Sequence, residues 1–125
     1  MSGFDLERTY LSLDGAGGVA EHPGGAAFWA TIETNSTLKG TLVIVIAGDG
    51  DWPHWEMHPS GQEILVLLEG ELTMLFDDGV GETRHLMSAG TTLIVPSGVW
   101  HRALIDRPTR MMAITYGAGT DHRPI

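Results

Sequence analysis

The sequence predicts an all-β sandwich or barrel built as a single domain. Glycine and proline interrupt the chain throughout, and the stretches between them are short and rich in Val, Ile, Leu and Thr. No window has a sustained apolar period of 3.6 residues, which argues against a long helix. The 125 residues, 42% of them hydrophobic, are enough for one domain with one core.

The strands are predicted from the apolar stretches between turn signals. Glu69-Gly70, Asp77-Asp78-Gly79 and Pro96-Ser97-Gly98 mark three turns, where glycine supplies the positive φ that tight turns require. In chain order, the predicted strands are Thr9–Leu13, Ala27–Thr34, Thr41–Ala47, His54–His58, Glu63–Leu68, Glu71–Phe76, Glu82–Met87, Thr91–Val95, His101–Ile105 and Arg110–Tyr116.

These strands define a barrel with two looser ends. Residues 1–26 are predicted to form an N-terminal arm with at most one edge strand, because glycines cluster there. Residues 27–118 form the barrel, and residues 119–125 form a C-terminal tail without a role that the sequence shows. The run Leu42–Ile46 is apolar at every position, so we expect the barrel to cover one face and another layer or a partner subunit the other.

Charge and composition exclude several classes of protein. The formal net charge of −9 argues against binding to nucleic acid or to an anionic membrane surface. The absence of cysteine excludes disulfides, thiolate catalysis and cysteine-based metal sites. With no apolar leader and no run long enough to span a membrane, a cytoplasmic protein is expected.

Candidate metal ligands are concentrated between residues 54 and 63. His54, Glu56 and His58 alternate along one predicted strand, so their side chains should share a face. Glu63 opens the next strand, and His101 enters an apolar strand after a turn. Mixed imidazole and carboxylate ligands suit Mn, Fe, Co, Ni or Zn. The sequence therefore predicts a divalent transition-metal site.

The two blocks that contain these residues resemble the two motifs of the small single-domain cupins. In the first motif, a histidine, a glutamate and a glycine at fixed spacing correspond to His58, Glu63 and Gly70. In the second motif, the matching positions are Gly90, Pro96, Gly98 and His101. The resemblance covers roughly residues 50–105 and implies a jelly-roll β-barrel, also called a double-stranded β-helix.

The chain departs from the family pattern at three positions. Glu56 stands at the first histidine position, Ile105 stands at the final asparagine position, and Gly50 is one place from the expected glycine. Since the family tolerates other residues at the first position, the resemblance implies an Fe, Mn, Zn or Ni ion held by Glu56, His58, Glu63 and His101. With two carboxylates and two neutral imidazoles around a divalent ion, the formal charge of this set is zero.

His54 is an alternative ligand that would leave Glu56 free to act as a base. It lies two residues from Glu56, about 6–7 Å along an extended strand. Ligation by both His54 and His58 would therefore need a bulge. The sequence places Glu56 first and His54 at the rim of the site.

Two kinds of function follow from these expectations. The first is a metal-dependent enzyme that acts on a small organic molecule, of the dioxygenase, isomerase or lyase type that the cupin resemblance implies, with His54 or His85 as a proton shuttle. The second is a non-catalytic module that binds a metal or a small ligand as a sensor. A homodimer is expected, because the Leu42–Ile46 strand and the outward-facing Trp55 and Trp100 need cover.

Overall fold

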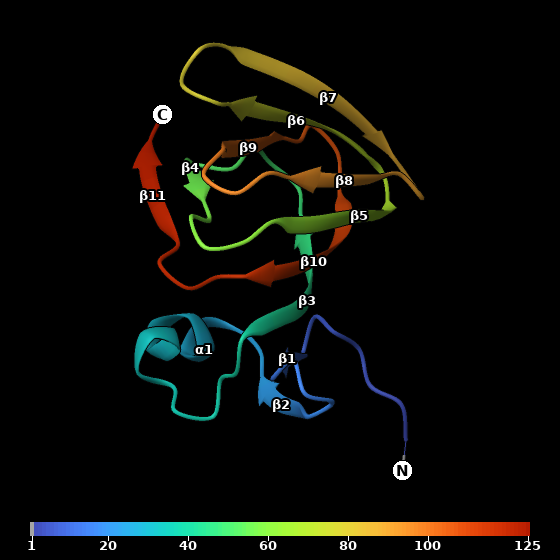
Figure 1. Cartoon of the computed structure of the whole chain (residues 1–125). Coiled ribbons are helices and arrows are strands. Elements are labelled where there is room, and N and C mark those ends of the chain that lie inside the picture. The colour runs from blue at the N-terminus through green and yellow to red at the C-terminus, as the bar shows by residue number, and fades with distance from the viewer. Residues whose placement is uncertain (1) are drawn as a thin grey trace.

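Two antiparallel β-sheets pack face to face in the computed structural model, which describes residues 2–125 (Figure 1). The six-stranded sheet has the order β2-β1-β3-β10-β5-β8 and consists of β1 (Thr9–Leu13), β2 (Val19–Pro23), β3 (Thr41–Gly48), β5 (Glu63–Glu69), β8 (Thr92–Val95) and β10 (Thr109–Tyr116). The five-stranded sheet has the order β11-β4-β9-β6-β7 and consists of β4 (His54–Met57), β6 (Glu71–Asp77), β7 (Glu82–Ser88), β9 (Trp100–Leu104) and β11 (Asp121–Pro124). The predicted all-β jelly-roll class is confirmed.

Alternating side chains build the core between the two sheets. In β5, Leu65 and Leu67 are buried, whereas Ile64 and Leu68 are exposed on the other face. The inward residues of the five-stranded sheet meet them from the opposite side. The fully buried side chains of the core include Leu65, Leu67, Met74, Met87 and Val95.

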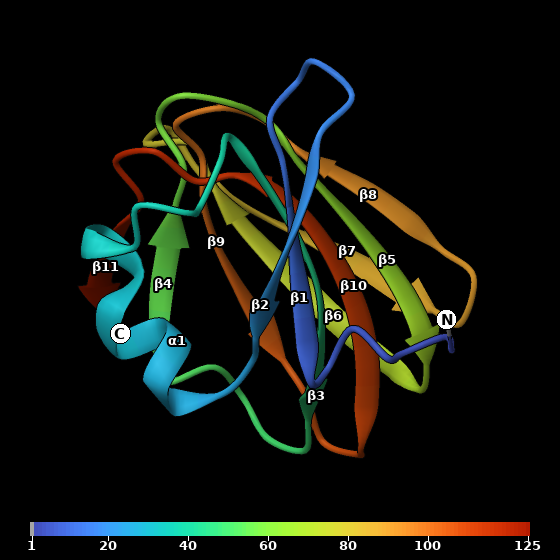
Figure 2. The same cartoon turned by 90° about the horizontal axis from the view of Figure 1, so that it is seen from below.

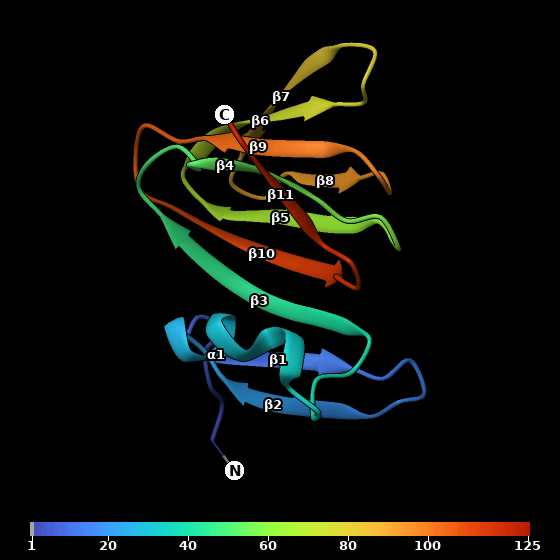
Figure 3. The same cartoon turned by 90° about the vertical axis from the view of Figure 1, so that its left-hand side faces the viewer.

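The outer face of the six-stranded sheet carries a transverse row of aliphatic side chains, which we call the outer row. Cross-strand neighbours share a face, and the register places Ile94, Ile64, Ile114, Val43 and Leu11 opposite one another in turn. Figure 3 shows the strands β1, β3, β10, β5 and β8 that carry this row. The row leaves Ile94 57% exposed and Ile64 38% exposed.

The segment predicted as a strand over Ala27–Thr34 is helical, so that prediction was wrong. It forms α1 (Ala26–Thr31) followed by a 3-10 turn over Ile32–Thr34. Phe28 is buried, with its ring edge-on to Tyr10 at 5.0 Å, and Ile32 lies one turn later on the same face. Figure 2 shows the helix beside β1 and β2. A helix of this length is too short to show the helical period in the sequence.

The N-terminal arm contributes two strands to the sheet, where at most one edge strand was expected. β1 lies between β2 and β3, and only β2 is at the edge. Beneath this hairpin, the buried Ser12 hydroxyl lies 2.7 Å from Nε2 of the buried His22. The same hydroxyl accepts a hydrogen bond from the Lys39 amide, so it ties the hairpin to the chain that follows α1.

The C-terminal tail is also ordered into the fold, as β11 pairs with β4. The Arg123 guanidinium lies over the rings of Trp55 and Trp100, 5.0 and 4.7 Å from their centroids, and forms an ion pair with Asp77. These tryptophans are therefore covered by the chain's own last strand. Within residues 2–125, no helix is long and apolar enough to cross a membrane.

Candidate metal centre

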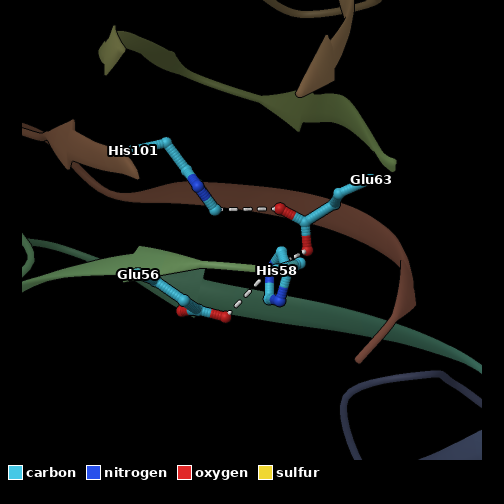
Figure 4. Close-up of side chains that lie close together, drawn as sticks. All are labelled: Glu56, His58, Glu63 and His101. Atoms are coloured by element: carbon cyan, nitrogen blue, oxygen red, sulfur yellow. Dashed lines mark ion pairs between the residues drawn. The ribbon is translucent and has the colours of Figure 1, made fainter. Parts of the chain in front are cut away.

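Four side chains predicted as metal ligands lie together between the two sheets (Figure 4). Glu56 belongs to β4, His58 follows it, Glu63 opens β5 and His101 lies in β9. The register places Glu56 directly opposite His101. A hydrogen bond from the Gly98 amide to the His58 carbonyl joins the two loops that carry the motifs. Both sheets therefore contribute to one cluster, which we call the inner cluster.

The polar atoms of the inner cluster approach one another closely. The Nε2 atom of His58 lies 3.2 Å from Oε1 of Glu56 and 3.2 Å from Oε2 of Glu63. The Nε2 atom of His101 lies 3.0 Å from Oε1 of Glu63. One ligand atom from each of the four residues falls within a group no wider than 4.8 Å.

Burial of the inner cluster is uneven. The side chains of His58, Glu63 and His101 are 3%, 5% and 0% exposed, whereas that of Glu56 is 26% exposed. Solvent therefore reaches the cluster from the Glu56 side. Two surface hollows lie at the other end of the sandwich. Both are lined by Glu71 and Asp106, and neither includes any of the four residues.

Three buried polar atoms of the inner cluster lack hydrogen-bond partners within the described chain. They are Nε2 of His58, Oε1 of Glu63 and Nε2 of His101, which lie in ion-pair contact at 3.0 to 3.2 Å with one another's residues but form no hydrogen bond. Such buried atoms are costly unless something satisfies them. A cation at their centre would accept an electron pair from each, and two imidazoles with two carboxylates suit a divalent transition metal. The residues present therefore fit such an ion.

The charges of the inner cluster shift the pKa values of His58 and Glu63 in opposite directions. Burial alone lowers the pKa of His58, but the carboxylates of Glu56 and Glu63 outweigh it and raise that pKa from 6.5 to about 9. Burial alone raises the pKa of Glu63, but His101 and His58 outweigh it and lower that pKa from 4.5 to about 2. Near neutral pH without a metal, Glu63 is therefore ionised and His58 is a protonated imidazolium. A metal ion that binds His58 would have to displace its extra proton.

Hydrogen bonds behind the histidines fix which ring nitrogen faces the inner cluster. The Thr120 hydroxyl donates to the Gly117 carbonyl, so toward Nδ1 of His58, 2.7 Å away, it acts as an acceptor. His58 therefore carries a proton on Nδ1. The Nδ1 atom of His101 faces the Val99 carbonyl at 3.3 Å. Both rings accordingly turn Nε2 toward the carboxylates, as metal-ligating histidines do.

Two threonines that the sequence did not single out support this arrangement. The Thr115 hydroxyl of β10 donates a hydrogen bond to Oε2 of Glu63, and Thr120 holds His58. Neither residue belongs to the matched motifs. Only the pairing of Thr115 with Glu63 across β10 and β5, and the return of the C-terminal tail, bring them to the site.

The other sequence candidates lie outside the inner cluster. His54 packs edge-on against His122 with 4.7 Å between ring centroids and belongs to a separate group with Glu56. His85 lies on β7, where Nε2 is 2.9 Å from the Thr83 hydroxyl and the ring is 4.3 Å from that of Phe76. Glu56 therefore lies close to His58, Glu63 and His101, whereas His54 and His85 lie outside the inner cluster.

The fold and the inner cluster together make this protein a jelly-roll β-barrel with a candidate metal site between its sheets. Residues 41–115, more than half of the chain, match the cupin domain family. The chain belongs to this family, as the resemblance of its motifs implied.

The chain is also similar to one curated protein and, in fold, to several solved structures. It is 36% identical over 58 residues to the uncharacterized protein YdbB of Bacillus subtilis (strain 168), and the match covers 46% of each. The chain thus matches about half the length of this relative. Its fold resembles that of the Bacillus subtilis oxalate decarboxylase studied for its Mn(II) centres, with a TM-score of 0.59 and 15% identity, over 74% of this chain and 26% of that one. It also resembles Fe(II)-HppE with an alternative substrate, with a TM-score of 0.53 and 22% identity, over 62% of this chain and 43% of that one.

Proposed function

We propose that this cupin is a metal-dependent enzyme acting on a small organic substrate, of the dioxygenase, isomerase or lyase type. The observation that carries the proposal is the set of three buried donor atoms, on His58, Glu63 and His101, that converge without hydrogen-bond partners among the described residues. Such a set is costly unless it binds something. Glu56, the exposed member, completes it at the side from which a substrate would approach.

The four residues would hold a divalent ion, for which Fe, Mn, Zn and Ni are the candidates. Mn(II) and Fe(II) are the metals named for the two similar structures above, which supports these two first. When bound, such an ion polarises an oxygen of the substrate or supports redox chemistry. The protein orients both Nε2 atoms through Thr120 and the Val99 carbonyl, and keeps Glu63 ionised.

Charge narrows the class of substrate. Two carboxylates balance a divalent ion, so the loaded site is formally neutral. No lysine or arginine is buried within residues 2–125, and the most enclosed arginines pair elsewhere: Arg102 with the Trp52 carbonyl, Arg110 with Glu7 and Arg123 with Asp77. The site therefore lacks the cations that a phosphorylated or polycarboxylate substrate needs. A neutral or singly charged molecule with oxygen ligands is the expected substrate.

Elemental analysis of the purified protein, made without a polyhistidine tag, tests the metal site. We expect the native protein to hold transition metal, and Glu63→Gln and His58→Ala each to hold about one ion per chain less than the native protein. His85→Ala is the matched control, because it removes a histidine of the same molecule outside the inner cluster. A full metal content in both inner-cluster variants would refute the site.

A second candidate function, a metal sensor without turnover, is favoured by the burial of the inner cluster. Only Glu56 among its four members has a side chain more than 5% exposed. Water-proton relaxation of the Mn(II)-loaded protein separates the two functions. A catalytic site should hold exchangeable water that small oxygen-bearing ligands displace, whereas a closed site should not.

We further propose that the chain forms a homodimer through the outer row. Ile94 of β8 and Ile64 of β5 are exposed, and the half-buried Ile114 of the neighbouring strand β10 extends this apolar row. Apolar surface of this kind on a soluble protein is typical of an interface.

A further inference from the structure

A second group of potential ligands lies beside the inner cluster on its solvent side. Ligand atoms of His54, Glu56 and His122 fall within 4.8 Å of one another. The two imidazole rings meet edge to face with 4.7 Å between their centroids. We call these three residues the outer group.

The strand pairing of the C-terminal tail creates the outer group. β11 runs antiparallel to β4, and His122 lies directly opposite Glu56. His54 lies two residues from Glu56 on the same strand and therefore on the same face. The pairing of His122 with Glu56 across the strands, and the position of His54 two residues from Glu56, bring all three side chains together. None of this follows from the cupin motifs, because His122 lies outside residues 41–115.

Glu56 belongs to both groups through different oxygen atoms. Its Oε1 lies 3.2 Å from Nε2 of His58, whereas its Oε2 lies 4.0 Å from Nε2 of His122. A carboxylate placed in this way can bridge two cations. The outer group is also open to solvent, since the His122 side chain is 54% exposed, so water or a small anion can complete the coordination of an ion there.

We propose that His54, Glu56 and His122 form a second divalent transition-metal site that shares Glu56 with the inner cluster. Two imidazole nitrogens and one carboxylate oxygen suit Zn²⁺, Ni²⁺ or Cu²⁺. Ligand atoms around a tetrahedral zinc ion lie about 3.4 Å apart. The separations in the outer group therefore need only small rotations of the exposed His122 and of the partly exposed His54 and Glu56 side chains. This site goes beyond the proposed function and does not depend on the chemistry of the inner cluster.

The test is a Zn²⁺ titration of metal-stripped, untagged protein by isothermal titration calorimetry, with bound zinc counted after dialysis. Wild-type protein should bind two equivalents. His122→Ala and His54→Ala, both changes at the surface, should each bind the second equivalent at least ~100-fold more weakly and retain the first. Glu56→Gln should weaken both equivalents, because its carboxylate serves both sites.

Two further variants separate the outer group from the inner cluster. Glu63→Gln should lose the inner equivalent and keep the one that depends on His122, so that failure of the inner site leaves the outer one measurable. His85→Ala, the matched histidine control, should bind as the wild type does. A His122→Ala protein that binds zinc as the wild type does, in number of equivalents and in affinity, would overturn the proposal, whereas a single wild-type equivalent lost in His122→Ala would overturn only the inner site.

Discussion

Glu63 is the fixed negative charge of the inner cluster. It is buried, lies between two imidazoles and accepts a hydrogen bond from Thr115. Because His101 and His58 outweigh its burial and lower its pKa to about 2, it stays ionised throughout the range in which the protein would work. The protonation state of His58 then determines how strongly a cation binds.

The metal affinity should therefore rise with pH. The raised pKa of His58, about 9, means that binding a cation displaces one proton over most of the neutral and alkaline range. We expect the apparent affinity to rise about tenfold per pH unit between pH 7 and pH 9 and then to level off. Chelator competition at a series of pH values measures it. A flat profile would contradict the assignment of His58 as a ligand.

The same shifts set the stability of the metal-free protein. The His58 pKa is raised above its ordinary 6.5, so its contribution to the free energy of unfolding is complete below pH 6.5 and is lost as the pH rises through about 9. The Glu63 pKa is lowered from 4.5, so its contribution is complete above pH 4.5 and is lost as the pH falls toward about 2. Urea unfolding of stripped protein should show a maximum between pH 4.5 and pH 6.5.

Thr120 should matter to metal affinity although it touches no metal. Thr120→Val keeps the shape of the side chain but removes the acceptor for Nδ1–H of His58, so the ring loses its fixed orientation. We expect metal affinity to fall about 10–100-fold with the fold retained. Thr92→Val, at an exposed position of β8, is the matched control. Equal affinities in the two variants would show that the hydroxyl has no such role.

At the scale of elements, the C-terminal strand β11 depends on one side chain. Arg123 stacks over Trp55 and Trp100 and pairs with Asp77 of β6. Arg123→Ala should lower the free energy of unfolding by about 1–3 kcal/mol, from two cation–π contacts and one ion pair. Urea denaturation followed by tryptophan fluorescence measures the change. Arg84→Ala, at an exposed position of β7, is the control. If Arg123→Ala lowers the free energy of unfolding no more than Arg84→Ala does, Arg123 does not stabilise β11.

The motif blocks were predictable from the sequence because each is local. Alternation along one strand placed Glu56 beside His58, and a short turn brought Glu63 next to them. The supporting threonines were not predictable, because Thr115 and Thr120 reach the site only through pairing with distant strands. α1 was missed for a different reason. Its burial of Phe28 against Tyr10 outweighs the strand propensity of its aromatic and β-branched residues.

At the scale of the whole molecule, the outer row predicts association in solution. We expect light scattering coupled to size exclusion to give a dimer at micromolar concentration. Ile94→Glu should shift it to monomer without unfolding, since this side chain is 57% exposed on the outer face. Val80→Glu, at a 97% exposed position in the turn between β6 and β7, should leave the dimer intact. A monomeric wild-type protein would refute the proposal.

The assembly of the inner cluster from both sheets has a consequence for folding kinetics. β4 and β9 share a single register pair, Glu56 with His101, and these residues are far apart in the chain. Because the loop between them must close first, we expect these long-range contacts to form late in folding. An ion held there should therefore stabilise the native state far more than the transition state, so it should slow unfolding while hardly changing the refolding rate. Loading with metal would then prolong the lifetime of the folded protein without helping it to form.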